Sequence, residues 1–289
     1  MQGECNTFDV VSETCSNLHS HPGYHFDGVI ARAGLLMSLL RAIQQIQHEI
    51  WIRFEDCGLV AAAYANDGTL MAEMRLKSAA WKYYRTTYNC TTCLPCLVKV
   101  NVQTMCDLLS NSNLDVYDSV RLYVRNDSTQ LQIVVEGMCA ALPRLHDQTR
   151  PTTPLPVRTF TTSFKVQSVE LQRMLKQVSV LSNSAYVNLR EYDDHWYLTM
   201  DTLRDGAYSH RLDETGRVTA HTIALALMSD LQPCAMRRII LYLRGERIAA
   251  MLENLHMYEY TTVYLATDCR MHLNWSCPNI GGLHVVCSI

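Results

Sequence analysis

One order of predicted elements occurs twice along this chain. An amphipathic helix that leads into a run of short strands is predicted for residues 26–76, and the same order is predicted again for residues 164–212. The offset between the copies is about 135 to 140 residues, far longer than the period of a solenoid repeat. The sequence therefore predicts two similar domains, each with few helices and many short strands.

Turn residues separate the predicted strands in both copies. In the first copy, HEIWIRFE, LVAAAYA and TLMAEMRL are separated by turns at residues 55–58 and 66–68. In the second copy, SAYVNLRE, HWYLTMD and AYSHRL are separated by turns at residues 192–194 and 204–206. Clusters of Asp, Asn and Gly between short apolar runs are typical of antiparallel meanders, so we expect no parallel βαβ units.

The length of 289 residues suits two domains of ordinary size. We predict a flexible tail at residues 1–23, a first domain at 24–137, a connector at 138–156 and a second domain at 157–289. The connector region contains four prolines within about twenty residues, which indicates an extended linker. Residues 1–23 lack the basic start and apolar block of a signal peptide, and charges interrupt every apolar run before it could span a bilayer.

Four helices are predicted from apolar residues that recur at helical spacing. They cover residues 33–47, 101–110, 168–178 and 246–255. The polar faces of the first and third have a positive bias, whereas that of the second is nearly neutral. The net charge of the chain is -3, which argues against a protein that coats nucleic acid with its whole surface but leaves room for a local basic face.

The order of predicted elements is strand, helix, meander, helix and meander, repeated once and joined by a connector that contains prolines. This order resembles that of the DNA sliding clamps of the proliferating-cell-nuclear-antigen superfamily. The resemblance covers roughly residues 24–289. Within the superfamily, the sequence is most similar to the Rad-one subunits of the heterotrimeric checkpoint clamp, the nine-one-one complex. The segments that carry this likeness are LLMSLLRAIQQIQHEIWIRFEDCGLVAAAYANDGTLMAEM, VQSVELQRMLKQVSVLSNSAYVNL, WYLTMDTLRDGAYSHRLD and MHLNWSCPNIGGLHVVCS.

The resemblance implies an α+β DNA-clamp fold, in which each domain has two helices on antiparallel sheets. Three such chains would form a ring of six domains around duplex DNA, with the helices lining the hole. A lining that slides needs positive charge and hydrogen-bond donors for phosphates but no base readout. The residues expected to face DNA are Arg41, Gln45, Lys99, Lys165, Arg173, Lys176, Gln177, Arg244 and Arg247.

One alternative stays open for this lining. Each of these side chains is also what an ordinary solvated helix face would carry. Acidic residues on or near the same helices weaken a positive field, namely Asp107, Glu170, Glu246 and Glu253.

Ring closure in such clamps resembles the pairing of an edge strand of one chain with an edge strand of the next. The matching positions are residues 130–136 and 206–212, and the other possibility is that both are internal strands. The expected interface residues are Leu131, Ile133, Val135, Ala207, Ser209 and Arg211. Clamps also bind client peptides under the connector, which is predicted here at residues 138–156.

A rival motif is the cysteine cluster Cys90, Cys93 and Cys96, whose spacing could supply three thiolates to zinc, with Cys57 or a histidine as the fourth ligand. No second ligand pair follows at a recognisable distance, which favours reduced cysteines. The twelve cysteines in a chain without a secretory signal are typical of the cytosol or nucleus. The acidic residues at Asp56, Asp67 and Asp205 fall in predicted turns, where aspartate bonds to the local backbone.

Three hypotheses follow. The preferred one is a non-enzymatic nuclear subunit of a heterotrimeric clamp in the DNA-damage checkpoint and repair. It would bind duplex DNA without sequence specificity, two other clamp-like subunits, a clamp loader and client peptides, with no cofactor and no membrane. The second is a polymerase processivity clamp, homotrimeric or viral. The third, from a different class, is a zinc or redox protein centred on Cys90, Cys93 and Cys96.

Overall fold

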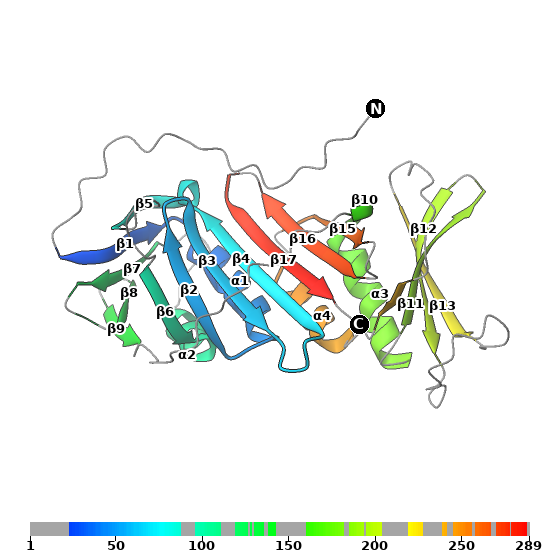
Figure 1. The fold of residues 1–289 in the computed structure, drawn as a ribbon, viewed down its shortest axis with the longest axis horizontal. Helices are drawn as coiled ribbons and strands as arrows, with labels where there is room; N and C mark the ends of the chain where they lie inside the picture. Colours follow the sequence, from blue (N-terminus) through cyan, green and yellow to red (C-terminus); the bar gives the residue numbers. More distant parts are fainter. Residues whose placement is uncertain are drawn as a thin grey trace.

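The computed structural model of this chain describes residues 23–87, 96–110, 119–126, 128, 130–135, 138–142, 160–181, 185–193, 195–203, 219–227, 239–241, 245–255, 258–266, 270–277 and 279–287 (Figure 1). Its elements follow one order twice: a strand, a helix, a meander, a second helix and a second meander. The repeat predicted from the sequence is therefore present as a repeat of secondary structure.

The described part of the first half contains two α-helices. Its elements are β1 (Tyr24–Ile30), α1 (Ala33–Gln44), β2 (Glu49–Glu55), β3 (Gly58–Tyr64), β4 (Leu70–Lys77), a 3-10 turn (Ser78–Ala80), β5 (Trp81–Thr86), β6 (Cys96–Asn101), α2 (Val102–Ser110), β7 (Val120–Arg125), β8 (Leu131–Val135) and β9 (Met138–Leu142).

The second half repeats this order. Its elements are β10 (Phe160–Gln167), α3 (Ser168–Leu181), β11 (Ala185–Tyr192), β12 (His195–Leu203), β13 (Thr219–Ala226), β14 (Ile239–Leu241), α4 (Gly245–Glu253), β15 (Tyr260–Ala266), β16 (Met271–Cys277) and β17 (Gly281–Cys287).

Three antiparallel sheets organise the described strands. The central sheet has the order β10-β15-β16-β17-β4-β3-β2-β6, and it is flanked by a sheet of order β5-β1-β7-β8-β9 and a sheet of order β13-β12-β11-β14. In Figure 1 the central sheet lies in front, with α1, α2 and α4 behind it and α3 at its right end. The predicted α+β class with antiparallel sheets is confirmed.

The central sheet joins the two halves of the chain. Strand β17, the last strand of the second half, pairs with β4 of the first half from Gly281 opposite Leu76 to Cys287 opposite Leu70. Gly281 has a φ of 108°, and a Cβ there would lie 2.0 Å from the carbonyl oxygen of Arg75. The close approach of β4 at this point therefore requires glycine.

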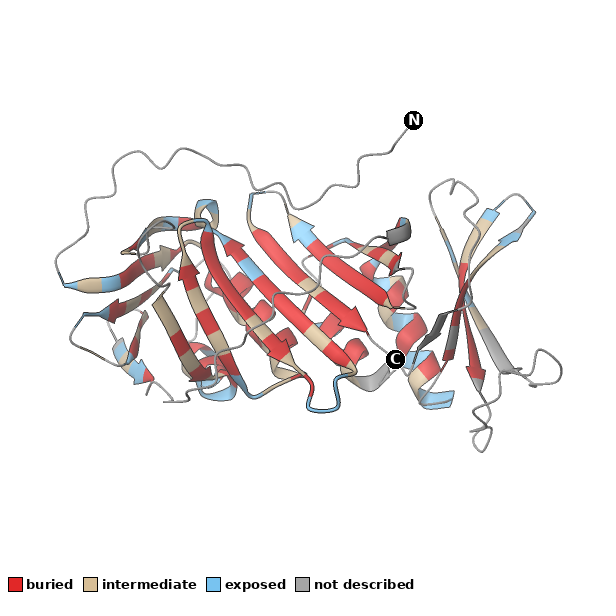
Figure 2. Ribbon diagram, in the orientation of Figure 1, coloured by how far each residue is buried: buried red, intermediate tan, exposed pale blue. Residues whose placement is uncertain are grey.

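The core lies between the sheets and the helices (Figure 2). On α1, the side chains of Leu36, Leu39, Leu40 and Ile43 are fully buried, as the helical spacing of the sequence predicts. The ring of Phe26 on β1 stacks on that of Phe54 on β2 at a centroid distance of 3.7 Å, which joins the five-stranded sheet to the central sheet. Each such side chain contributes roughly 1.5 to 3 kcal/mol when fully buried.

One predicted boundary is wrong at its start. The segment expected to be an extended connector begins with β9, which pairs with β8 from Leu131 opposite Leu142 to Val135 opposite Met138. The stretch MCAAL before the first proline carries no feature that blocks strand pairing, so it adds to the sheet. Residues 143–159 lie outside the part of the chain that the structure describes.

Candidate nucleic-acid interface

The four helices among the described residues form one continuous row. Helix α1 contacts α2 on one side and α4 on the other, and α4 in turn contacts α3, so the order is α2, α1, α4, α3. Their apolar faces point into the core, and the opposite faces carry the polar side chains. We call this polar surface the helix row. It brings together side chains from both halves of the chain.

Polar contacts link α1 and α2 on the exposed side of the row. The Arg41 guanidinium donates a hydrogen bond from Nη2 to Ser110 Oγ at 2.9 Å. The amide of Gln44 bonds to that of Gln103, whose Nε2 donates to Asp107 Oδ1 at 2.7 Å. The start of α2 is capped by Asn101, whose Oδ1 accepts the Thr104 N–H at 2.9 Å. These contacts orient amide and hydroxyl groups at the surface.

Carboxylates neutralise two of the four basic side chains on the described helices. On α3, Arg173 forms an ion pair with Glu170 at 2.5 Å. Lys176 forms an ion pair with Glu253 of α4, which joins the two helices across the surface. Both pairs are exposed, so each contributes little to stability and is weakened by salt.

The formal charges of the described helices therefore balance. Their four cations, Arg41, Arg173, Lys176 and Arg247, are matched by four carboxylates, Asp107, Glu170, Glu246 and Glu253. Around them lie partly or fully exposed glutamines, namely Gln44, Gln103, Gln172 and Gln177. Such a surface offers donors to phosphate oxygens without a strong field, which suits contact without tight or sequence-specific binding.

Most of the predicted DNA-facing residues lie in the helix row. Arg41, Arg173, Lys176, Gln177 and Arg247 are on its helices, and Gln45 follows the last residue of α1. Arg244 lies outside the described residues. The sequence reasoning missed Gln44, Gln103 and Ser110, although their position on the polar stripes of the predicted helices was a usable signal.

Two predicted lining residues are on the wrong face. On β6, Val98 and Val100 are buried toward the helices, so strand alternation turns Lys99 to the opposite face, where it pairs with Glu49 at 3.2 Å. On β10, Phe164 and Val166 are buried, and the exposed Lys165 likewise points away from α3. Proximity to a helix start in the sequence did not predict the face.

The expected edge strand of the first half is also wrong. Strand β8 lies between β7 and β9, so the backbone of Leu131, Ile133 and Val135 is paired within the sheet and their side chains are buried. The edge is β9. The second predicted segment, with Ala207, Ser209 and Arg211, lies outside the described residues. Among the described strands, β13 lies at one edge of the four-stranded sheet.

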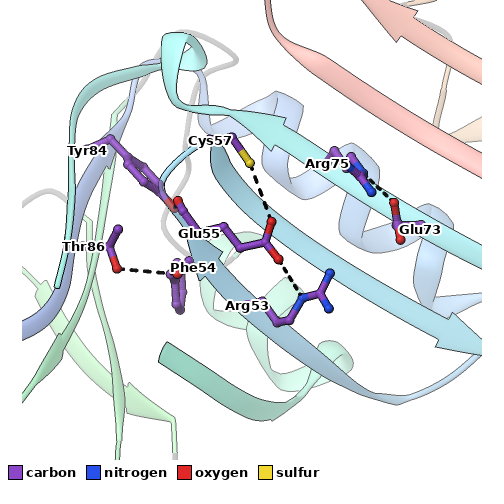
Figure 3. Close-up of polar contacts among 8 residues, drawn as sticks. All are labelled: Arg53, Phe54, Glu55, Cys57, Glu73, Arg75, Tyr84 and Thr86. Atoms are coloured by element: carbon purple, nitrogen blue, oxygen red, sulfur yellow. Dashed lines mark hydrogen bonds and ion pairs between the residues drawn. The ribbon is translucent and has the colours of Figure 1, made fainter. Parts of the chain in front are cut away.

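The outer face of the first half holds a polar cluster around Glu55 (Figure 3). The Glu55 carboxylate pairs with Arg53 at 3.1 Å and lies 3.6 Å from Cys57 Sγ, while its backbone carbonyl accepts the Tyr84 hydroxyl at 2.7 Å. Burial, followed by the charge of Glu55, raises the pKa of the Cys57 thiol. A raised pKa leaves less thiolate, which makes this cysteine a poor nucleophile and a poor metal ligand at neutral pH.

The zinc hypothesis is tested only in part. Within the described ranges, no group of three or more His, Cys, Asp or Glu side chains is arranged to hold a metal ion. Cys96 is described, on β6, but Cys90 and Cys93 are not. Burial raises the pKa of Cys106 to about 11 and that of Cys287 to about 12.

Asp67 is a turn residue, since its Oδ1 accepts the N–H of Thr69 at 3.1 Å.

No family model and no curated protein matches this sequence. Solved structures match its fold over nearly its whole length. Proliferating cellular nuclear antigen (PCNA) from Entamoeba histolytica is 12% identical with a TM-score of 0.69, and the match covers 92% of this chain and 98% of that one. The chain has the sliding-clamp fold.

Two further solved structures support the same fold. A. fulgidus PCNA, solved bound to the C-terminal region of FEN-1, matches with a TM-score of 0.70 at 12% identity, covering 91% of this chain and 97% of that chain. A chain of the PCNA2-PCNA3 complex from Sulfolobus tokodaii matches with a TM-score of 0.67 at 13% identity, covering 91% and 98%. No helix among the described residues is long and apolar enough to cross a membrane.

Proposed function

We propose that this chain is one subunit of a DNA sliding clamp, a closed ring of three chains that encircles duplex DNA. The observation that carries the proposal is the helix row, which runs without a break across both halves of the chain, with α1, α2 and α4 behind the central sheet and α3 at its end. Its polar side chains are amides, hydroxyls and equal numbers of cations and carboxylates, and α3 adds the exposed Val169, Val180 and Leu181. That chemistry lets a duplex pass along the row without being held at one sequence.

The chain contains a template for ring closure. Within the chain, β4 pairs with β17. Strand β4 is the third strand after the first helix of the first half, and β17 is the last strand of the second half. The corresponding strands without such a partner among the described elements are β13 and β9, each at the edge of its sheet. Pairing of β9 with β13 of a neighbouring chain repeats the internal junction and closes a ring of alternating halves.

We place the chain in a mixed ring, a heterotrimer that acts in the nucleus in the DNA-damage checkpoint and in repair, with two other clamp-like subunits, a clamp loader and client peptides. The balanced charge of the helix row supports this, because three copies would offer duplex DNA no excess of cations from these helices. Partner chains with more basic helices would supply that excess. The PCNA2-PCNA3 complex of S. tokodaii combines two different clamp chains, which supports such mixing within this fold.

Light scattering of the purified chain separates the mixed ring from a homotrimeric processivity clamp. The mixed ring predicts a particle near the 32.9 kDa of one chain. A stable particle of about three times that mass contradicts the mixed ring and favours the processivity clamp. Affinity purification from native cells is then expected to recover two further clamp-like chains and a loader.

The edge strands provide a matched test of assembly. Ala224 and Ala226 are exposed on β13, and lysines there should block pairing with a neighbouring strand. The A224K/A226K variant should remain folded but fail to form the ring with its partners. The control is A79K, an exposed alanine in the 3-10 turn, which should assemble normally. Unchanged assembly of the β13 variant contradicts closure through this edge.

A further inference from the structure

The five-stranded sheet presents tyrosine and arginine side chains on the face that points away from the core. Its buried face carries Phe26, Leu122 and Ile133. On the opposite face, strand alternation and register place Asp27 between Arg85 of β5 and Tyr123 of β7. We call this surface the tyrosine–arginine face; its members are Tyr24, Tyr83, Arg85, Arg121, Tyr123 and Arg125.

A buried carboxylate holds one guanidinium of this face in place. Arg121 donates from Nε and Nη2 to the two oxygens of Asp27, both at 2.8 Å, and the Asp27 residue is only 6% exposed. The Arg121 guanidinium carbon lies 5.0 Å from the ring centre of Tyr123 and 5.8 Å from that of Tyr24. These two rings meet edge to face at 5.6 Å. The group is thus preorganised before any ligand binds.

A second pair extends the face onto the neighbouring edge strand. The Arg85 guanidinium lies 5.0 Å from the ring centre of Tyr83, and Arg85 is exposed while Tyr83 is partly exposed. Arg125, also exposed, follows Tyr123 by two residues and so shares its face. The three arginines exceed the one aspartate by two, in a chain whose net charge is -3. The face is therefore a local positive surface on an acidic protein.

We propose that the tyrosine–arginine face binds single-stranded nucleic acid. Guanidinium groups pair with phosphates, and tyrosine rings on adjacent strands offer stacking surfaces to unpaired bases regardless of sequence. The major groove of duplex DNA admits a helix or a two-stranded ribbon and not the face of a five-stranded sheet, so the duplex is the poorer ligand. Charge complementarity favours an anionic polymer over an apolar protein surface, because the cores of protein interfaces are depleted in charge.

This inference is independent of the ring. The face points away from the core, and the helix row belongs to other elements, so a duplex in the hole and a single strand on the tyrosine–arginine face do not compete. A linear oligonucleotide can be tested on the isolated chain, which requires no partner subunit. Loss of one proposal therefore leaves the other standing.

Fluorescence anisotropy with a labelled 20-residue oligothymidine at low salt tests the inference. The chain should bind with a Kd of about 1 to 100 µM. Y83A should weaken binding about tenfold, since stacking on one aromatic ring is worth a factor of this order. R85A should weaken binding and reduce the slope of log K against log salt by about 0.7, the value for one phosphate contact on a single strand.

The controls remove the same groups elsewhere. K165A deletes an exposed cation on the outer face of β10, and Y260A deletes a tyrosine that is 39% exposed at the start of β15. Both should change the Kd less than twofold, with urea unfolding of every variant confirming the fold. No binding, equal effects of tests and controls, or equal binding of a 20-base-pair duplex would overturn the proposal. Tighter binding of a labelled polyglutamate peptide, lost in Y83A and R85A, would overturn it in favour of an acidic protein partner.

Discussion

The junction between β4 and β17 should make the stability of this chain depend on pH. His284 on β17 is partly buried, opposite Glu73 of β4, and its Nε2 lies 3.1 Å from Nδ1 of His272 on β16. Burial lowers the pKa of His284 from 6.5 to about 4; the charge of Glu73 opposes this shift and that of Arg75 adds to it. The folded chain therefore takes up this proton less readily than the unfolded chain.

The sign and size of the effect follow from linkage. Because the pKa of His284 is lower in the folded chain than in the unfolded chain, the unfolded chain binds the proton first as the pH falls. The free energy of unfolding is therefore at its full value above pH 6.5 and decreases as the pH falls through 6.5 toward 4. One pKa unit corresponds to about 1.4 kcal/mol, so the full loss is about 3 kcal/mol. Between pH 7.5 and pH 5 the expected loss from His284 alone is about 2 kcal/mol.

Urea unfolding of the wild type and of H284Q at both pH values isolates this residue from the other histidines. The variant should lose about 2 kcal/mol less than the wild type between pH 7.5 and pH 5. The control is H48Q, at an exposed position after α1, which should follow the wild type. Equal losses in the wild type and H284Q would refute the reasoning about the burial of His284 at the junction.

Three further predictions concern single contacts. G58A should destabilise the chain by about 2 kcal/mol or more in urea unfolding, because Gly58 has a φ of 137° and a Cβ there would lie 2.0 Å from the Leu76 carbonyl oxygen. The control G68A, at a φ of 69° with open space around it, should cost about 1 kcal/mol, and an equal cost for both variants would contradict this prediction. R121A should lower the free energy of unfolding by about 1 to 2 kcal/mol, because it leaves the buried Asp27 without its guanidinium partner but removes an arginine side chain that is 41% exposed. Adding D27N should restore part of the loss in a double-mutant cycle, and purely additive costs would argue against the pairing. R41E/R247E should weaken retention of the assembled ring on DNA about tenfold with unchanged urea unfolding. The surface control K165E should leave retention unchanged, and equal effects of the two variants would show that these helices do not contact DNA.

The helices were predictable because their burial follows a simple period. The predicted segment 168–178 begins with α3 at Ser168, and 33–47 and 101–110 match α1 and α2 with deviations of at most three residues. Helical spacing of apolar residues also predicts which face is polar, which explains why Arg41, Arg173 and Lys176 were found.

Strand order was not predictable in the same way. An internal strand and an edge strand alternate alike, so the pattern of Leu131, Ile133 and Val135 cannot reveal that β9 covers β8. Lys99 and Lys165 were misplaced because closeness to a helix start says nothing about which face of a strand a residue occupies. The tyrosine–arginine face escaped detection because Asp27 and Arg121 are far apart in sequence and meet only through the pairing of β1 with β7.

A topological retention assay decides whether the helix row lines a hole around DNA. The chain, assembled with its clamp-like partners, is loaded onto closed circular plasmid, washed with high salt and then treated with a single-cutting nuclease. Encirclement predicts that the complex survives the salt wash on the circle and slides off after linearisation. Release by salt from the circle, or equal retention on circular and linear DNA, would contradict a ring that holds DNA through its helix row.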